Sequence, residues 1–391
     1  MSYVNRMNPG VNLTALRGHN AALVLDLLRA AGEKGISRLE LAERTGLTPQ
    51  AVSKITARLR AEGFAAEAGR RASTGGKPRT VLRLVPGAGH AVGLHLDRDE
   101  LTAVLVDLTG SVVAERRAPL AFGAGAEAVV ETAAGEVEEL LGAGRGVSGA
   151  VPGAMSGAVS GLVSGVGVAL PGPLDHAEGV LRRVTGFPEW DGFALRDALG
   201  ARLGLPVVVD KDTNAAALGL ALAGDADSFA YLHLGTGLGA GLVLDGALYR
   251  GARTGAGEFG HQVLQLDGPR CGCGDRGCVE ALCLAAVAEG DVEEAARVLG
   301  TAAGNLVALL DVDRVLLGGR TVFAEGDVFV RGVGAVVAER VGRGGGGSGG
   351  EGGGARVSVG LAPGGERGVA EGAAQLVLAP VFGRADVGGV G

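Results

Sequence analysis

One short stretch, residues 261–278, constrains this chain more than any other part of its sequence. It contains His261, Cys271, Cys273 and Cys278, in a chain with only four cysteines and six histidines. The three glycines between these cysteines have no side chain that could pack in a core, but they let a backbone wrap tightly around a small ion. One imidazole and three thiolates form the closed tetrahedral set that holds structural Zn²⁺. We therefore predict a zinc loop over residues 261–278.

The alternative for these cysteines is a disulfide. The close Cys-Gly-Cys spacing disfavours it, and a cysteine cluster in a cytosolic chain more often binds metal or does redox work. The fourth cysteine, Cys283, lies among apolar residues, and we expect it in the core.

The composition describes a large chain without a membrane segment. Its 391 residues are 47% hydrophobic, which is enough for two or three domains. The longest apolar runs are short and broken by charge, so we expect no membrane span. Residues 1–10 have no apolar signal core, so we expect a cytoplasmic protein.

Charge is distributed unevenly along the chain. Residues 1–85 contain 14 Lys and Arg against 6 Asp and Glu, a net charge of +8. The whole chain carries −7, so the remainder carries −15. A basic segment ahead of an acidic one suggests that the basic segment binds a polyanion. We predict a DNA-binding domain over residues 1–85.

Residues 37–64 follow the pattern of a helix-turn-helix. Ser37 and Glu40 form a capping box, and Gly46 supplies the turn. Thr48 and Pro49 read as the N-cap and the first position of a second helix. Apolar residues of that helix face inward at helical spacing, which leaves polar residues near its start facing outward. The candidate DNA-contacting residues are Gln50, Ser53, Lys54 and Arg58.

The residues that follow the second helix predict a wing, with two short strands around a basic, glycine-rich tip. The wing residues expected at phosphates or the minor groove are Arg70, Arg71, Lys77 and Arg79. The alternative is an ordinary helical bundle with a solvated basic face. The wing and the charge asymmetry favour a double-stranded DNA operator as partner.

From about residue 90 the pattern changes to strands alternating with helices. "LPVVVDKDTNAAALGLALAG" reads as a strand, a polar corner and a helix, and "FAYLHLGTGLGAGLVLDG" as a strand, a glycine loop and a strand. The fold class is therefore α/β, with a second domain over residues 90–391. Repeated β-hairpins suggest two related lobes around a cleft.

Several motifs of the second domain, taken in order, resemble the ROK family (repressors, open reading frames, kinases). They are "LPGPLD", "FPEW", "DTNAAALG", "LGTGLGAGLVLDG" and "GEFGHQVLQLDGPRCGCGDRGCVE". The resemblance implies a two-lobed actin-like domain, also described as sugar-kinase-like or ribonuclease H-like, with a sugar cleft. The winged helix-turn-helix ahead of it matches the repressor branch, as in xylose and N-acetylglucosamine repressors.

The resemblance also implies a ligand set. Family kinases use an aspartate as general base on a sugar hydroxyl, and Asp212 stands at that position. Family contacts to sugar fall on Glu258, His261 and Glu280. His261 would use one ring nitrogen for zinc and the other for a sugar hydroxyl. The alternatives are a helix N-cap for Asp212 and exposed loop carboxylates for Glu258 and Glu280.

One departure from the kinase pattern concerns phosphate binding. Family kinases carry an Asp-x-Gly-Gly-Thr turn that cradles phosphate with backbone N–H groups, and this chain has "LDRDELTAV" there. Asp97 remains, whereas Arg98, Asp99 and Glu100 replace the glycine turn. We expect the two added carboxylates to repel a triphosphate, and the missing glycines to prevent close backbone approach.

The second departure is Lys211, which stands where the family has an asparagine that binds sugar hydroxyls. It is a further candidate ligand-binding residue. Lys211 either pairs with Asp210 or Asp212, or it favours an acidic or phosphorylated ligand.

These observations predict a sugar-responsive DNA-binding regulator, most simply a repressor of carbohydrate metabolism genes, with structural Zn²⁺ as its one cofactor. We expect a sugar or sugar-phosphate effector and a homo-oligomer, either dimer or tetramer. No catalytic residue is expected, and Asp212 would be catalytic only in a kinase. One alternative is an ATP-dependent, glucokinase-like sugar kinase with an accessory DNA-binding head. Another is a ligand-independent regulator with a vestigial cleft.

Overall fold

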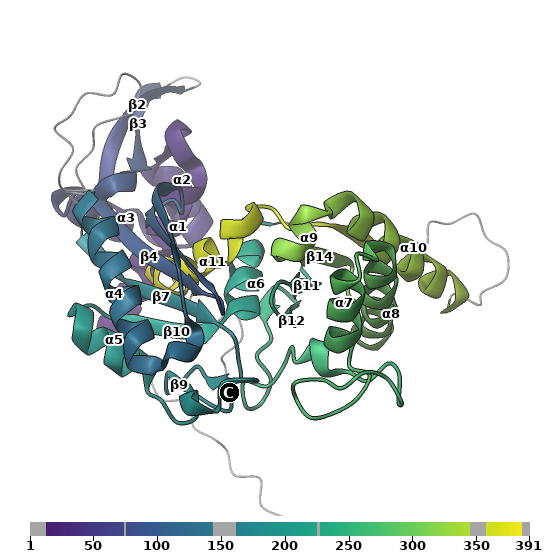
Figure 1. Cartoon of the computed structure of the whole chain (residues 1–391). Coiled ribbons are helices and arrows are strands. Elements are labelled where there is room, and N and C mark those ends of the chain that lie inside the picture. Colours follow the sequence, from purple (N-terminus) through teal and green to yellow (C-terminus); the bar gives the residue numbers. More distant parts are fainter. Residues whose placement is uncertain (1–12, 74–75, 144–161, 225–226, 345–356, 385–391) are drawn as a thin grey trace, which may run out of the picture. The chain divides into compact units, whose positions relative to one another are not determined.

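The computed structural model describes residues 13–73, 76–143, 162–224, 227–344 and 357–384 (Figure 1). Contacts divide the chain into two compact units. The first unit contains residues 1–89 and 378–385, and the second contains residues 90–377 and 386–391. The first division falls after Gly89. The return of residues 378–385 to the first unit was not expected from the sequence.

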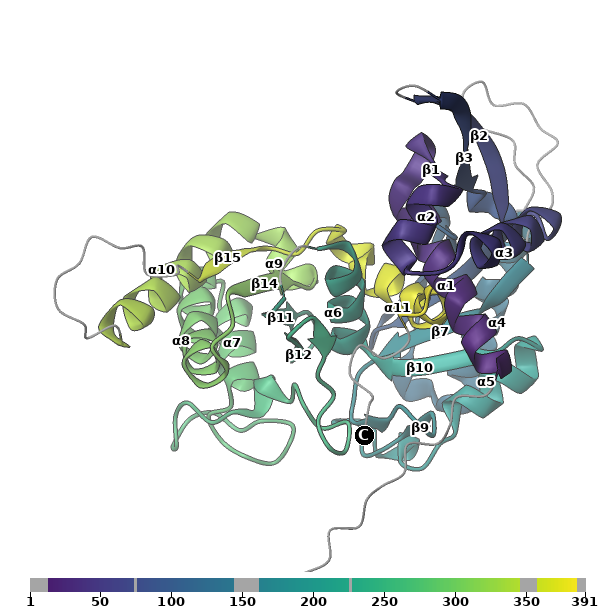
Figure 2. The same ribbon diagram turned by 180° about the vertical axis from the view of Figure 1, so that it is seen from behind.

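The first unit is a winged helix-turn-helix (Figure 2). Its helices are α1 (Leu13–Ala31), α2 (Arg38–Thr45) and α3 (Pro49–Ala61), and its strands are β1 (Ile36–Ser37), β2 (Ala65–Ser73) and β3 (Gly76–Leu84). The strands form one sheet in the order β1-β3-β2.

The predicted signals at the helix ends are confirmed. The Ser37 side chain accepts from the Glu40 N–H, and the Glu40 carboxylate accepts from the Ser37 N–H, which completes the capping box. Gly46 ends α2 in the left-handed conformation, with φ of 68°. The Thr48 side chain accepts from the Ala51 N–H, with Pro49 at the first position of α3. The sequence therefore specifies the turn between α2 and α3 locally.

The last residues of the first unit pack on α1. Phe382 lies in the 3₁₀ turn Ala379–Phe382, is fully buried, and has the Arg29 guanidinium 4.3 Å above its ring. The Arg384 guanidinium pairs with the Asp26 carboxylate at 3.0 Å. Two segments at opposite ends of the chain therefore make one core.

The second unit contains two five-stranded sheets with the same topology. Each begins with three antiparallel strands, adds its fourth strand beside the first, and adds its fifth strand beside the fourth. Lobe A is built on β10-β7-β4-β5-β6, with strands β4 (Gly89–Leu96), β5 (Glu100–Asp107), β6 (Val112–Pro119), β7 (Leu162–Leu170) and β10 (Val207–Lys211). Lobe B is built on β13-β12-β11-β14-β15, with strands β11 (Phe229–Leu234), β12 (Leu238–Leu244), β13 (Ala247–Leu248), β14 (Arg314–Gly318) and β15 (Ser358–Leu361). The expectation of two related lobes is confirmed.

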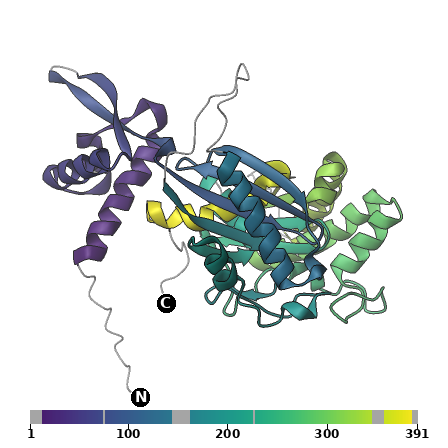
Figure 3. The same cartoon turned by 60° about the vertical axis from the view of Figure 1, so that its left-hand side comes forward.

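Helices cover both faces of the lobe A sheet. Apolar residues of α4 (Ala126–Ala143) and α5 (Leu195–Leu203) share a core with β4, β5 and β7. In Figure 3, α4 lies along one face of this sheet. On the opposite face, α11 (Gly368–Leu378) lies directly on Gly93 and Gly167. A Cβ at either glycine would lie within 2 Å of a carbonyl oxygen of α11, at 1.9 Å and 1.8 Å. These glycines allow a helix backbone to rest on the sheet.

Lobe B is covered by α7 (Val279–Ala288), α8 (Val292–Leu310) and α10 (Gly326–Gly344), whose apolar residues form its core. Cys283 is fully buried in that core, as predicted. The remaining elements are the hairpin β8 (Leu174–Asp175) with β9 (Val180–Leu181), and the helices α6 (Asp212–Ala223) and α9 (Arg320–Ala324). Among the helices of the described ranges, none is both long and apolar enough to cross a bilayer.

Candidate functional site

The four predicted metal ligands converge in the loop before α7. The ligand atoms of His261, Cys271, Cys273 and Cys278 all lie within 4.8 Å of one another. His261 Nδ1 is 3.6 Å from Cys271 Sγ, and Cys273 Sγ is 3.7 Å from Cys278 Sγ. Zn–S bonds of about 2.3 Å and Zn–N bonds of about 2.0 Å in a tetrahedron place ligand atoms about 3.6 to 3.8 Å apart. The cluster therefore fits a zinc ion.

The backbone of the loop holds the ligands in this arrangement. The Cys271 N–H donates to the Asp275 carbonyl at 2.8 Å, and the Gly277 N–H donates to the Pro269 carbonyl at 2.8 Å. Gly277 has a φ of 65°, and a Cβ there would lie 1.6 Å from the Gln265 carbonyl oxygen. Only glycine fits at this position.

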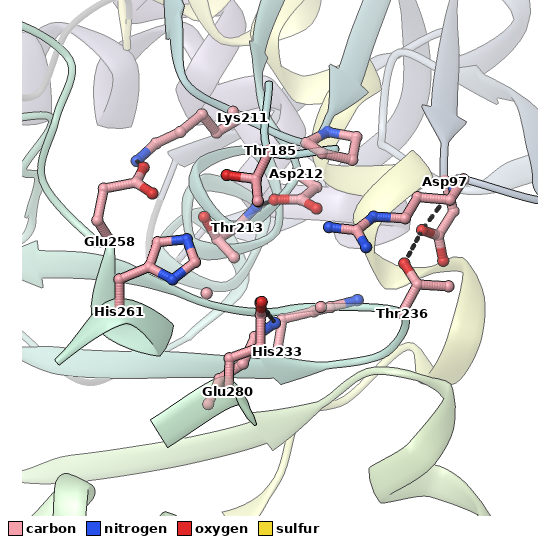
Figure 4. Close-up of a pocket in the computed structure, with 17 residues that line it drawn as sticks. Asp97, Thr185, Lys211, Asp212, Thr213, His233, Thr236, Glu258, His261 and Glu280 are labelled. Atoms are coloured by element: carbon pink, nitrogen blue, oxygen red, sulfur yellow. Dashed lines mark hydrogen bonds and ion pairs between the residues drawn. The ribbon is translucent and has the colours of Figure 1, made fainter. Parts of the chain in front are cut away.

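A pocket of about 600 Å³ lies next to this loop, between lobes A and B. All five predicted ligand-binding residues line it: Lys211, Asp212, Glu258, His261 and Glu280 (Figure 4). They come from the β10–α6 corner, the 3₁₀ turn Phe259–His261 with the residue before it, and the first turn of α7. The structure thus brings together residues separated by up to 69 positions in the sequence.

Asp212 is the first residue of α6, directly after β10, so it is not the N-cap that the alternative interpretation expected. Its carboxylate accepts from the Thr213 N–H at 2.6 Å. Burial raises the pKa of Asp212, and the nearby His233 opposes that rise. A carboxyl of raised pKa beside a polar pocket is typical of functional sites.

Lys211 has a partner that the sequence did not indicate. Its ammonium donates to Glu258 Oε1 at 3.1 Å and to the Ala256 carbonyl. The predicted pairing with Asp210 or Asp212 is therefore wrong. Asp210 pairs instead with Arg250 at 2.7 Å. Lys211 is thus a buried cation whose charge is already neutralised by the carboxylate of Glu258.

Glu280 and His261 present polar atoms to the same pocket. Glu280 Oε2 accepts from the Leu238 N–H at 2.8 Å, and the residue is only 9% exposed, so the loop-carboxylate interpretation is wrong for it. Glu258 is 41% exposed and held by Lys211. Because His261 turns Nδ1 toward Cys271, its Nε2 is the ring nitrogen available to a ligand.

The turn at residues 97–100, where we predicted the loss of a phosphate cradle, joins β4 to β5. Asp97 Oδ1 accepts from the Arg98 N–H at 2.7 Å and from the Thr236 hydroxyl at 2.6 Å. Asp99 pairs with Arg320 at 2.8 Å, and Glu100 lies 3.9 Å from Arg117. Both added carboxylates thus have cationic neighbours, which weakens the electrostatic part of our argument against triphosphate binding.

Among the further residues that line the pocket are four polar residues that were not selected as ligands from the sequence: Asp97, Arg98, His233 and Thr236. A histidine in the otherwise apolar strand β11, just before the glycine turn, was the available signal for His233. Burial disfavours ionisation of Asp97, but the hydrogen bonds from Thr236 and the Arg98 N–H, together with the nearby His95 and His233, outweigh it. The pKa of Asp97 therefore lies below its usual value.

The predicted DNA-contacting residues of α3 lie on its exposed side: Gln50, Ser53, Lys54 and Arg58. In the wing, Arg70 and Arg79 are exposed, while the side chains of Arg71 and Lys77 lie outside the described residues. Val52 and Leu59 are buried on the inner side of α3, as expected. Thr56 is also fully buried, and its hydroxyl donates to the Val52 carbonyl at 2.8 Å.

Comparisons with known proteins agree with this division of the chain. The winged helix-turn-helix DNA-binding family matches residues 23–64. The xylose repressor of Bacillus subtilis (strain 168) is 29% identical over 251 residues, covering 63% of this chain and 61% of that protein. The DNA-binding transcriptional dual regulator NagC of Escherichia coli (strain K12) is 28% identical over 281 residues, covering 71% of this chain and 65% of that protein.

A solved ROK family transcriptional regulator, a homolog of the E. coli MLC protein, superposes with a TM-score of 0.73. It is 23% identical, covers 95% of this chain and 98% of its own, and shows the fold. The ROK family itself matches residues 91–288, which is half of the sequence. Together with the zinc-type cluster and the cleft between two related lobes, this match shows that the chain belongs to the ROK family.

Proposed function

We propose that this chain is a sugar-responsive transcription regulator, most simply a repressor, that does not transfer phosphoryl groups. The observation that carries the proposal is the combination, in one chain, of a winged helix-turn-helix and a polar pocket lined by all five predicted ligand residues. Its similarity to the xylose repressor and NagC supports this assignment. Such a regulator would act in the cytoplasm.

The DNA contacts follow from exposure and charge. Gln50, Ser53 and Lys54 lie near the start of α3, where recognition helices contact base edges. Arg58 lies one turn further on, and Arg70 and Arg79 lie on the wing. These arginines are placed to neutralise phosphates, which supplies affinity independent of sequence.

The sugar contacts follow from the pocket. A zinc ion held by His261 and the three cysteines, with His261 bound through Nδ1, leaves Nε2–H to donate to a sugar hydroxyl. Asp212 and Glu280 each have a carboxylate oxygen outside their backbone hydrogen bonds, and these oxygens accept from sugar hydroxyls. Zinc would supply no chemistry beyond fixing the loop, because all four of its positions are filled by protein.

A route for the response begins at Asp212. This residue starts α6, and α6 packs closely on α11, where a Cβ on Gly219 would lie 2.9 Å from the Gly372 Cα. The chain continues from α11 into residues 378–385 of the first unit. A ligand that favours one arrangement of the lobes shifts the population of states. In a homo-oligomer, a dimer or tetramer, this shift changes the spacing of two DNA-binding units.

The rival function is an ATP-dependent sugar kinase. Asp212 favours it, because a carboxylate of raised pKa suits a general base. The turn between β4 and β5 disfavours it, because the Arg98 and Asp99 carbonyls accept from Phe122 and Leu120 and fix a turn that has no glycine. Without a phosphate cradle, a base alone has no phosphoryl donor to work with.

Two measurements on the full chain test the proposal. Selection from random duplex DNA gives the bound sequences, and fluorescence anisotropy then gives their affinity with each member of a sugar panel. We expect at least one sugar or sugar phosphate to change DNA affinity about tenfold or more. In a coupled assay with Mg²⁺ and ATP we expect no phosphorylation of those sugars. Phosphorylation that is abolished in Asp212→Asn would make the protein a kinase.

A further inference from the structure

Arg98 occupies an unusual position in the pocket. Its backbone is fixed within the β4–β5 turn, because its N–H donates to Asp97 Oδ1 and its carbonyl accepts from the Phe122 N–H at 3.1 Å. Its side chain extends to the glycine turn of lobe B, residues 235–237, which joins β11 to β12. A Cβ on Gly237 would lie 3.4 Å from Arg98 Nη2 and 3.1 Å from Glu280 Oε2. The guanidinium therefore lies at the Gly237 end of the pocket.

Among the residues that the structure describes, the Arg98 guanidinium has no ion pair, and its Nε is buried without an acceptor. Its nearest ring, Phe187, is 5.8 Å away. A buried guanidinium donor without an acceptor costs free energy that an incoming acceptor recovers. Arginine presents up to five N–H groups in a planar fork that matches phosphate and carboxylate oxygens.

Several other charged groups of the pocket have protein partners. Lys211 donates to Glu258 and Ala256, so its charge is already balanced. Asp97 Oδ1 accepts two hydrogen bonds, and Glu280 Oε2 accepts one. An anionic ligand that enters this pocket thus finds Arg98 as the cation with unsatisfied donors.

The arrangement of the pocket residues assigns the sugar ring and the anionic substituent of such a ligand to different sides of the pocket. Figure 4 shows Glu258 and His261 on one side, Asp97 and Thr236 on the other, and Asp212 between them. A sugar ring beside His261 and Glu258 would extend a substituent past Asp212 toward the Gly237 turn. Glu280 borders that turn as well, so the substituent must bind the guanidinium directly rather than rely on a generally positive field.

We infer that Arg98 is a specificity-determining residue and that the effector is an anionic monosaccharide, whose phosphoryl or carboxylate group binds its guanidinium. This inference rests on the proposed function, because it names the ligand class of the same pocket. It also assigns a binding role to a residue of the altered β4–β5 turn, where the sequence suggested only a lost cradle.

Isothermal titration of the full, zinc-containing protein tests this. The probes are glucose, xylose and N-acetylglucosamine, the 6-phosphates of the two hexoses, xylose 5-phosphate, glucuronate and inorganic phosphate. We expect one anionic sugar to bind about 10- to 100-fold more tightly than its neutral parent, because hydrogen bonds to charged groups are that strong. Phosphates and glucuronate distinguish the two anionic groups.

Three variants isolate the role of Arg98. Arg98→Gln should remove the preference for the anionic sugar and leave the affinity of the neutral parent unchanged. Arg98→Lys should retain part of the preference, since a point charge lacks the bidentate fork. Arg297→Gln, at an exposed arginine paired with Glu294 on α8, is the matched control and should change nothing.

The outcomes separate the two proposals. Equal affinity for neutral and anionic sugars, or a preference that survives in Arg98→Gln, overturns the role of Arg98 and leaves the sugar-responsive regulator standing. Failure of every sugar and sugar phosphate to bind overturns both. Binding of inorganic phosphate alone, unchanged in Arg98→Gln, also counts against this anion site.

Discussion

The ammonium of Lys211 lies 3.1 Å from the carboxylate of Glu258, across 47 positions of sequence. The two partners are unequally buried, since the Lys211 side chain is 3% exposed and that of Glu258 is 41% exposed. An ion pair of this kind is asymmetric, because a buried charge without its partner costs more than a half-exposed one.

We therefore predict that Glu258→Gln destabilises the second unit more than Lys211→Met does. The first variant leaves a buried ammonium without a counter-charge and should cost about 2–4 kcal/mol, and the second should cost about 1–2 kcal/mol. Urea unfolding followed by tryptophan fluorescence measures both, since Trp190 is buried in lobe A. The double variant should cost less than the sum of the single changes, and strict additivity would contradict the pairing.

The metal cluster predicts one Zn²⁺ per chain. Cys273→Ser should lose the zinc and lower the melting temperature, because a structural site contributes its binding free energy to folding. Elemental analysis of protein purified without chelator measures the metal content. Cys283→Ser is the control, because this cysteine is buried in lobe B outside the cluster, and it should keep its zinc. A wild-type protein without zinc would refute the prediction.

The buried His95 predicts a pH-dependent stability. Burial lowers the pKa of His95 to about 4, and the neighbouring His233 and Arg320 act in the same direction against Asp97. As the pH falls, His95 takes up a proton near pH 6.5 in the unfolded chain, but only near pH 4 in the folded chain. Stability from this group is complete above pH 6.5 and falls as pH drops toward 4, by about 3 kcal/mol.

The contribution of His95 to stability is measured as the difference between the wild type and His95→Asn. Urea unfolding at pH 7.5, 6.0 and 5.0 should show a steeper loss in the wild type than in His95→Asn, which has no ionisable ring. Parallel curves for the two proteins would show that His95 is not held neutral.

The wing and α3 should differ in their effects on DNA binding. Arg79→Ala and Lys77→Ala should weaken binding to all sequences and reduce the slope of log affinity against log salt by about one unit, because each removes one phosphate contact. Gln50→Ala should instead change base preference with little effect on the salt slope. Anisotropy titrations at several salt concentrations measure both quantities. A change of base preference in the wing variants would contradict the predicted contact between the wing and the phosphates.

How far the sequence predicts this structure depends on the range of the interactions. The capping box of Ser37 and the turn at Gly46 are local, so the helix-turn-helix was readable from residue order. The zinc ligands lie in one short loop, and their spacing alone indicated their convergence. The hairpin at the glycine turn Gly235–Gly239 was expected for the same reason.

The interactions that escaped prediction join distant segments. Glu258, the partner of Lys211, lies 47 positions further along the chain, and no local sequence signal connects it to β10. Arg320 reaches Asp99 across 221 positions. The direction of the Arg98 side chain depends on a turn that is held by hydrogen bonds from Leu120 and Phe122, which follow β6. Side-chain pairing across lobes is decided by tertiary packing, which residue order does not encode locally.

The packing of Phe382 and Arg384 on α1 has a consequence for biosynthesis. The ribosome makes residues 378–385 after all of residues 90–377, and domains generally fold in order from the N-terminus. A nascent chain that has emerged only to residue 89 therefore has a recognition helix but an uncovered face on α1. Its winged helix-turn-helix unit reaches the packed form described here only after residues 90–377 of the second unit have been translated.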